Sequence, residues 1–192
     1  MDDQTAISCI KQGDLNGLES LVDRYQARAV HAAYLIVYDR ALAEDIAQAA
    51  FVKVAERIHQ FDEQRPFGPW FFRIVVNDSL KAAKRQRRNV SLDESSEPST
   101  LKLATWLTDP APPPGEIVEE QEMRQQILKA VRSLTPEQRA VVVMRYFLDM
   151  SEADMSTHLK RPLSTIKWWL RDARKHLHHL IDDYFMRGVN YE

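Results

Sequence analysis

The segment SEADMSTHLKRPLSTIKWWLRDAR, residues 151–174, decides how the carboxyl-terminal half of the chain folds. Ser151 is a preferred N-cap residue, so a short helix is predicted to begin just after it. Residues 160–163 form a turn that contains Pro162, and a longer helix is predicted from Ser164 to about Met186. A short helix, a tight turn and a longer cationic helix are typical of a helix-turn-helix.

With about 100° of rotation per residue, the longer helix has a packing side and, about 80–180° around the helix from it, a cationic side. Its packing side is formed by Ile166, Leu170, Ala173 and Leu177. Its cationic side is formed by Lys167, Arg171, Arg174, Lys175 and His178, bordered by Trp168. We expect Trp169 to be packed and Trp168 to be exposed. Such a face suits a recognition helix in the DNA major groove, and a merely solvated face is the alternative.

A helix start is also predicted upstream of this segment. The sequence Thr135-Pro136-Glu137-Gln138 is a capping box with proline at the first helical position. It begins a helix that is expected to end near Phe147.

A second cationic helix is predicted over residues 70–88. One side is largely apolar and is expected to pack: Phe71, Phe72, Val75, Ser79, Ala82 and Ala83. The other side carries an aromatic–cationic stripe: Trp70, Arg73, Asn77, Lys81, Lys84 and Arg88, with Arg85 as a further cation nearby. Cations neutralise phosphates, an amide bonds a base edge, and an indole stacks on an opened base pair. The stripe favours nucleic-acid contact, and a basic surface helix with a buried Trp70 is the alternative.

The preceding helix is predicted from about Arg40 to Gln60, with Asp39 as its N-cap. Its inner side is apolar: Ala43, Ala47, Phe51, Val54, Ala55 and Ile58. Its outer side is acidic but includes an apolar residue: Asp45, Gln48, Ala49, Val52 and Glu56. This outer face is either a partner surface or an ordinary solvent-facing one.

Proline divides the chain into two parts. Five of the nine prolines lie within residues 98–114, after a run rich in Ser, Asp and Glu. Such a segment does not hold a regular helix. We therefore predict an all-α protein with two small domains, residues 1–90 and 116–192, joined by a flexible linker at residues 91–115. Trp106 makes this linker unusually apolar, so part of it is expected to dock.

Charge is distributed unevenly around a formal net value of -2. Residues 71–90 carry six Lys or Arg against one Asp, and residues 158–179 carry the same numbers. Residues 91–126 carry eight acidic against two basic residues. Two basic segments separated by an acidic one are typical of a nucleic-acid binder with two contact sites, and solvated helix faces are again the alternative.

Composition excludes several protein classes. The chain has 192 residues, of which 44% are hydrophobic and 28% are charged. The single Cys9 excludes an internal disulfide framework, and five glycines argue against a strand-rich fold or a glycine-rich phosphate cradle. No apolar run is long enough to span a membrane, and the start lacks the features of a secretion signal. We expect a cytoplasmic protein without direct membrane insertion.

No catalytic residue, metal ligand or cofactor is predicted. His176 and His179 share one side of a helix, but no Cys or carboxylate completes a zinc site. The sequence contains neither a Gly-x-Ser-x-Gly elbow nor a Walker pattern that would organise a catalytic or nucleotide site. The chain is therefore not expected to be an enzyme.

Four segments resemble bacterial RNA polymerase sigma factors of the extracytoplasmic-function (ECF) type. They occur in the family's order: AEDIAQAAFVK at 43–53, PWFFRIVVN at 69–77, SLTPEQR at 133–139 and PLSTIK at 162–167. The resemblance implies a first domain that binds core polymerase at its clamp helices and opens the minus-ten promoter element. It implies a second domain that meets the polymerase flap and reads the minus-thirty-five element by its helix-turn-helix.

The resemblance also assigns residues. Asp45 and Gln48, beside Val52, match positions that contact the polymerase clamp. Phe61 and Asn77 match positions that line the pocket for a flipped base. The major-groove positions are matched by Lys167, Trp168, Arg171 and Arg174. For this family an anti-sigma factor is the usual inhibitory partner.

The sequence departs from the family pattern at the turn. Lys160 stands where the family commonly has glycine, so either Lys160 adopts a left-handed backbone or the turn differs. Two other functions are alternatives to a sigma factor. One is a free-standing DNA-binding regulator that uses only the second domain, and the other is an interaction protein that does not bind DNA.

Overall fold

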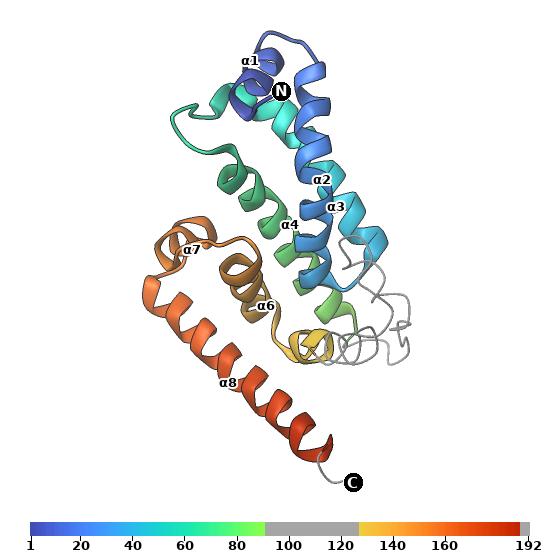
Figure 1. Ribbon diagram of the computed structural model, residues 1–192, viewed down its shortest axis with the longest axis vertical. Coiled ribbons are helices and arrows are strands. Elements are labelled where there is room, and N and C mark those ends of the chain that lie inside the picture. The colour runs from blue at the N-terminus through green and yellow to red at the C-terminus, as the bar shows by residue number, and fades with distance from the viewer. Residues whose placement is uncertain (91–126, 189–192) are drawn as a thin grey trace.

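Helices form the regular structure of the residues that the computed structural model describes, 1–90 and 127–188, and no strand occurs within these ranges (Figure 1). Residues 127–133 are helical. The other elements are α1 (Asp3–Lys11), α2 (Asn16–Val37), α3 (Arg40–Arg57), the 3-10 turn η1 (Ile58–Gln60), α4 (Phe67–Val90), α6 (Pro136–Val142), the π-helical turn η4 (Val143–Phe147), α7 (Glu152–Leu159) and α8 (Leu163–Gly188). The predicted all-α class is confirmed.

The amino-terminal half is a four-helix unit in which α2 contacts α1, α3 and α4. Asp39 caps α3 as predicted, because its side chain accepts a hydrogen bond from the backbone N–H of Leu42 at 3.0 Å. Helices α1 and α2 approach closely at Gly17, where an added Cβ would lie 2.2 Å from the backbone oxygen of Ala6. Only glycine fits this contact, so Gly17 sets how α1 closes on α2.

Aromatic rings form the centre of this unit. Phe71 of α4 is fully buried, and its ring centroid lies 4.6 Å from that of Phe51 and 5.7 Å from that of Phe67. Tyr25 of α2 meets Phe71 edge-on at 5.7 Å. These rings fix α4 against α2 and α3, which orients the aromatic–cationic stripe.

Helices α3 and α4 differ from the prediction at one end each. Helix α4 begins at Phe67, earlier than the predicted Trp70, because Pro69 lies in the first turn, where no intrahelical N–H donor is required. Helix α3 ends at Arg57, and a 3-10 turn replaces the last predicted helical residues. The predicted linker at residues 91–115 lies outside the described residues, so the two-domain boundaries stay a prediction.

The carboxyl-terminal half follows the local signals. Thr135 and Gln138 form the predicted capping box at the start of α6, and Ser151 caps α7. Lys160 adopts a left-handed backbone with φ 51°, which lets α7 stop and α8 begin after a short turn. The order α7, turn, α8 confirms the predicted helix-turn-helix.

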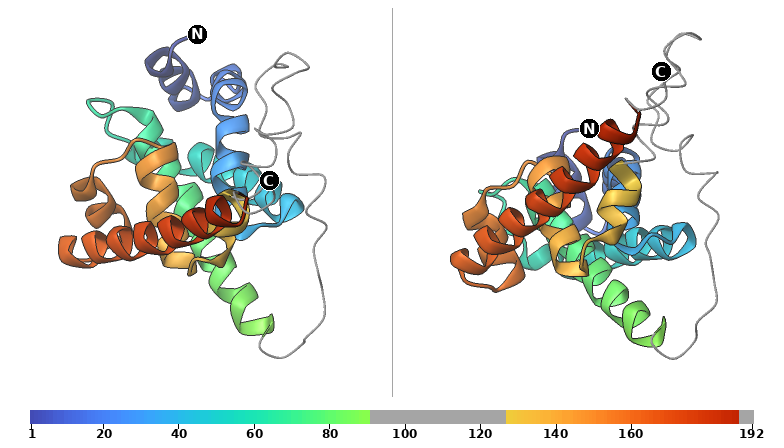
Figure 2. Two further views of the ribbon diagram at one scale, coloured as in Figure 1. Left: turned by 60° about the horizontal axis from the view of Figure 1, so that its bottom comes forward. Right: turned by 90° about the horizontal axis from the view of Figure 1, so that it is seen from below.

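The two halves pack on each other through α6. This helix contacts α8 and also contacts α2 and α4, so it lies between α8 and the amino-terminal unit (Figures 1 and 2). Buried residues of both halves form one continuous apolar cluster. Within the described ranges, none of the helices combines the length and the apolar character needed to cross a bilayer.

Candidate nucleic-acid and polymerase interface

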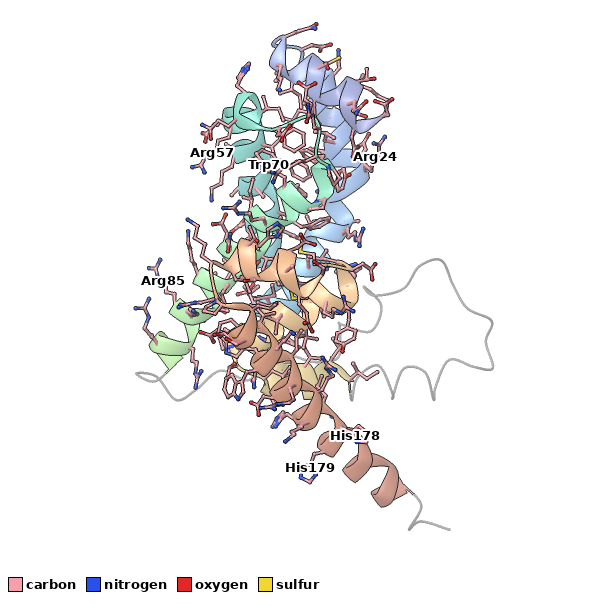
Figure 3. The ribbon with its side chains drawn as sticks, turned by 90° about the vertical axis from the view of Figure 1, so that its left-hand side faces the viewer. Arg24, Arg57, Trp70, Arg85, His178 and His179 are labelled. Atoms are coloured by element: carbon pink, nitrogen blue, oxygen red, sulfur yellow. The ribbon has the colours of Figure 1, made fainter. Side chains whose placement is uncertain are left out.

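The aromatic–cationic stripe follows one side of α4, opposite its packing side. The packing side is buried as predicted, including Phe71, Phe72, Val75 and Ser79. Lys81, Arg85 and Arg88 are exposed, whereas Trp70, Arg73, Asn77 and Lys84 are half-buried. Figure 3 shows Trp70 and Arg85 towards opposite ends of α4, with α6 and α7 lying in front of it. The stripe is therefore continuous along α4, and its middle is partly covered.

Trp70 is held in place by the aromatic core. Its ring centroid lies 5.0 Å from that of Phe61 and 5.8 Å from that of Phe67. The indole is half-buried and is not enclosed in the core, so part of it remains available for stacking.

Phe61 lies deeper than a stacking residue would. Only 5% of its surface is exposed, because its ring packs under Trp70 and beside Phe67. The segment that follows α3 is fixed by Lys11, whose Nζ donates to the Phe61 carbonyl oxygen at 3.3 Å and to Glu63 Oε1 at 2.6 Å. In this conformation Phe61 supports Trp70 and offers little ring surface of its own.

Charges near the stripe are partly balanced. Asp78 accepts a hydrogen bond from Lys53 Nζ at 2.5 Å and lies 3.9 Å from Lys81 Nζ. Lys84 Nζ lies 2.8 Å from Glu137 Oε1, at the start of α6. The Lys81 side chain is largely exposed, so its ammonium group lies at the surface. The Lys84 ammonium group instead forms an ion pair with Glu137 in the second half of the chain.

The cationic face of α8 is fully outward. Lys167, Arg171, Arg174 and Lys175 are all exposed, and Trp168 is 51% exposed. On the opposite side Ile166, Leu170 and Ala173 are completely buried. Trp169 packs against the core, so the different placements predicted for the two tryptophans are confirmed.

Two side-chain contacts hold α8 against the start of α6. The Gln138 amide donates to Asp172 Oδ2 at 2.6 Å while its oxygen accepts the backbone N–H of Thr135 at 2.9 Å. One turn along α8, His176 Nε2 lies 2.9 Å from Ser133 Oγ. These contacts orient the cationic face of α8 away from the core. His178 and His179 lie farther along α8 (Figure 3).

The outer face of α3 is exposed as predicted. Asp45 and Gln48 are exposed, and Val52 is 58% exposed although it is apolar. Ala43, Ala47 and Val54 on the other side are buried. Val52 is thus an exposed apolar side chain on an otherwise polar face of α3.

Sequence reasoning missed the residues that join the two halves. Arg28 donates from Nη2 to the Phe147 carbonyl oxygen at 2.9 Å, across 119 residues of sequence. Its guanidinium also lies 5.4 Å from the ring centroid of Phe72 and 5.8 Å from that of Phe147. Neither Arg28 nor Phe147 belongs to a motif, so no local signal identifies this contact.

His158 on α7 makes the free energy of unfolding depend on pH. Burial lowers its pKa, the charge of Arg73 lowers it further, and only Asp154 opposes this. Its Nδ1 is buried without a hydrogen-bond partner. A proton therefore binds the unfolded chain more tightly than the folded one, so stability is retained above the unfolded pKa of about 6.5 and is lost as the pH falls below it.

We expect the melting temperature of the wild type to fall by a few degrees more than that of His158→Gln between pH 7.5 and about 5.5. Scanning calorimetry at several pH values measures this difference. His59→Gln, which changes an exposed histidine, is the control and should follow the wild type. Identical pH profiles for His158→Gln and the wild type would contradict the assignment.

Two segments of the chain match regions of a known protein family. Residues 21–89 match the family described as Sigma-70 region 2, and residues 124–177 match Sigma-70, region 4. The chain is 26% identical over 178 residues to the ECF RNA polymerase sigma factor SigW of Bacillus subtilis, covering 92% of this chain and 95% of the relative. It is 24% identical over 174 residues to the RNA polymerase sigma-H factor of Pseudomonas aeruginosa, covering 90% of each.

Two solved structures have the same fold. CnrH, solved in complex with the cytosolic domain of CnrY, matches with a TM-score of 0.65 at 20% identity, covering 94% of this chain and 97% of that one. The sigma factor RpoE of Bartonella quintana, solved with the anti-sigma factor NepR, also matches with a TM-score of 0.65 at 20% identity, covering 88% of this chain and 98% of that one. The two regions match in the family's order, and the chain spans nearly the whole length of its relatives. This protein therefore belongs to the sigma-70 family, as an RNA polymerase sigma factor of the ECF type.

Proposed function

We propose that this sigma factor directs core RNA polymerase to specific promoters, using α4 to open the minus-ten element and α8 to read the minus-thirty-five element. The observation that carries the proposal is the pair of cationic faces on α4 and α8, each opposite a buried packing side. The face on α8 is exposed, and the face on α4 is exposed at Lys81, Arg85 and Arg88 and half-buried elsewhere. One face bears an indole and an amide among its cations, and the other belongs to a helix-turn-helix. An unpaired strand and a duplex call for these two different surfaces.

The aromatic–cationic stripe is assigned to the melted strand. Arg73, Lys81, Arg85 and Arg88 would hold phosphates, and Asn77 would bond the edge of an extruded base. Extruding a base costs a few kcal/mol, so the half-buried Trp70 ring must offer a stacking surface that offsets this cost. Phe61 supports the Trp70 ring, and direct contact of Phe61 with a base would require the segment fixed by Lys11 to move.

The cationic face of α8 is assigned to the upstream duplex. Lys167, Arg171 and Arg174 are long cations suited to guanine edges and phosphates, and Lys175 adds a phosphate contact. The exposed Trp168 indole offers an apolar surface of the kind that meets a thymine methyl group. The contacts of Gln138 and Ser133 with α8 would keep this face in one orientation as it enters the groove.

Protein partners complete the proposal. The outer face of α3, with Asp45, Gln48 and Val52, is assigned to the polymerase clamp helices, and the second domain to the polymerase flap. We also infer an anti-sigma factor as the inhibitory partner, because CnrH and RpoE of the same fold were each solved with another protein bound. The domains would be residues 1–90 and 116–192, with residues 91–115 between them, in the cytoplasm where polymerase acts.

Reconstitution tests the proposal directly. The protein should direct initiation from a small set of promoters when it is mixed with core polymerase and genomic DNA in a run-off assay. Val52→Asp should reduce binding to core polymerase by about tenfold or more, since it would bury a charge where the proposal places an apolar contact. Leu15→Asp is the matched control, because Leu15 is 70% exposed on a different surface and should leave core binding unchanged.

The alternatives give different results in the same assay. A free-standing regulator would bind duplex DNA tightly without comigrating with polymerase. A protein that does not bind DNA would show no affinity even at low salt, where phosphate contacts are strongest. No initiation from any promoter, with Val52→Asp equal to Leu15→Asp in core binding, would contradict the proposal.

A further inference from the structure

Helix α8 carries an acidic residue at the edge of its cationic face. In the sequence of residues 163–179, Asp172 is the single Asp or Glu. Side chains three and four residues apart are neighbours on a helix, so Asp172 lies between Trp168 and Lys175 along the axis of α8. Trp168 and Lys175 are both exposed. The Asp172 carboxylate therefore adjoins the surface that the proposed function assigns to the upstream duplex.

The Asp172 side chain is held in place by Gln138 of α6, the helix that lies beside α8 (Figure 1). Gln138 Nε2 donates to Asp172 Oδ2 at 2.6 Å, and Gln138 Oε1 accepts the backbone N–H of Thr135 at 2.9 Å. A backbone N–H can only donate, so it fixes which end of the amide is the oxygen and turns the amino group towards Asp172. Gln138 is also buried. The capping box of α6 thus sets the position of a carboxylate on α8.

The Asp172 carboxylate keeps most of its capacity to accept hydrogen bonds. A carboxylate has two oxygens with about four lone-pair sites, and Gln138 occupies one of them. Among the side chains that the structure describes, no second donor to Asp172 is found. The residue is half-buried, so part of it faces solvent. One carboxylate oxygen is therefore available to a donor from outside the chain.

The place of Asp172 along α8 favours contact with bases over contact with phosphates. The first turns of a recognition helix meet the base edges in the major groove. Asp172 lies within about the first three turns of α8, which begins at Leu163. A carboxylate opposes the binding of phosphates, so it weakens the affinity that the surrounding cations supply. An anion at this position suits discrimination between sequences.

We propose that Asp172 selects cytosine at one position of the upstream element, by accepting a hydrogen bond from the cytosine N4 amino group. The proposal rests on the upstream reading proposed for α8. In the major groove cytosine presents an amino donor, whereas guanine presents the N7 and O6 acceptors and thymine presents the O4 acceptor. A carboxylate attracts the donor and repels the acceptors. Adenine presents its amino donor beside the N7 acceptor, so it suits a carboxylate less well than cytosine.

Asp172→Asn distinguishes base contact from a structural role in joining α8 to α6. The new amide oxygen can accept from Gln138 in place of Oδ2, and the new amino group then lies where the available oxygen was. A donor thus replaces an acceptor on the DNA side, while the contact with α6 is kept. Base contact predicts that the preferred base changes from cytosine to guanine at one position, whereas a structural role predicts a uniform change across sequences.

Selection from a promoter library measures the preferred bases. A promoter found in the run-off assay is randomised in its upstream element, its minus-ten element is kept, and the fragments bound by the reconstituted holoenzyme are sequenced. The wild type should enrich cytosine over guanine at one position by about fivefold, the lower end of the range for a base-edge contact. Asp172→Asn should enrich guanine at that position and leave the others unchanged. Asp172→Glu, which keeps a carboxylate, should still enrich cytosine.

Asp149→Asn is the matched control for the loss of one negative charge. Asp149 is exposed and lies outside α8, and its φ of 54° is a left-handed conformation that asparagine also adopts. This variant should enrich the same bases as the wild type. The melting temperature of Asp172→Asn should equal that of the wild type, because the hydrogen bond with Gln138 is kept.

The results separate this inference from the function on which it rests. If the wild type and Asp172→Asn enrich the same bases at every position, Asp172 reads no base and α8 still reads the upstream element. A uniform loss of affinity in Asp172→Asn would also overturn base contact and assign Asp172 to the junction with α6. If the wild type prefers no base at any upstream position, the upstream reading by α8 is wrong, and the role of Asp172 fails with it.

Discussion

Reversing two charges on α8, Arg171→Glu together with Arg174→Glu, should reduce the affinity of the reconstituted holoenzyme for its promoter by about a thousandfold. A cation in contact with a base or phosphate contributes about 1–3 kcal/mol, and loss of two contacts corresponds to about 4 kcal/mol. Both side chains are exposed and belong to the outward face of α8, so the fold should survive. Mobility shifts with promoter fragments, over a range of salt concentrations, measure the loss.

A matched double variant tests whether the loss of affinity is specific to α8. Arg57→Glu together with Lys129→Glu changes the net charge by the same amount at exposed positions outside α8. If both double variants lose affinity equally, the effect is one of net charge and α8 is not the upstream reader. For the α8 variant, a loss that is larger on promoters with an intact upstream element indicates base contact, whereas a uniform loss indicates phosphate contact.

Phe71→Ala should lower the free energy of unfolding by about 3–5 kcal/mol, the range for deletion of a fully buried aromatic ring. Phe71 is 0% exposed and lies within ring-contact distance of Phe51, Phe67 and Tyr25, so the cavity would open where α2, α3 and α4 meet. Domains have only about 5–15 kcal/mol of stability in total, so this loss would remove a large share of it. Urea denaturation followed by far-ultraviolet circular dichroism measures the change.

Tyr146→Ala is the control for this variant. Tyr146 is 58% exposed on η4, and removal of an exposed ring should change the free energy of unfolding by less than about 0.5 kcal/mol. A comparable loss in both variants would mean that the aromatic centre of the amino-terminal unit does not hold α4 in place. In that case the orientation of the aromatic–cationic stripe would need another explanation.

Much of the fold and of both candidate faces was predictable from the sequence because the signals are local. Capping side chains at Asp39, Thr135 and Ser151 act within three residues of the helix start that each one sets. Helical periodicity, which repeats every few residues, assigned the buried and outward sides of α3, α4 and α8. It also separated the packed Trp169 from the exposed Trp168.

The remaining features depend on tertiary packing. Periodicity placed Trp70 on the outer side of α4, but only the packed structure brings Phe61 beneath it and leaves that ring 5% exposed. Likewise, the charge pattern placed Lys84 on an open stripe, and only the contact between the halves pairs it with Glu137.

The sequence by itself therefore determined the helices, their buried sides, the helix-turn-helix and the two cationic faces, since each is set by residues within a turn or two of one another. The tertiary structure alone decided which parts of those faces remain open. Arg28 and Phe147 meet across 119 residues, and such a contact follows from the shapes of two assembled halves. No short-range pattern encodes it, because its free energy comes from surfaces that exist only after both halves have folded.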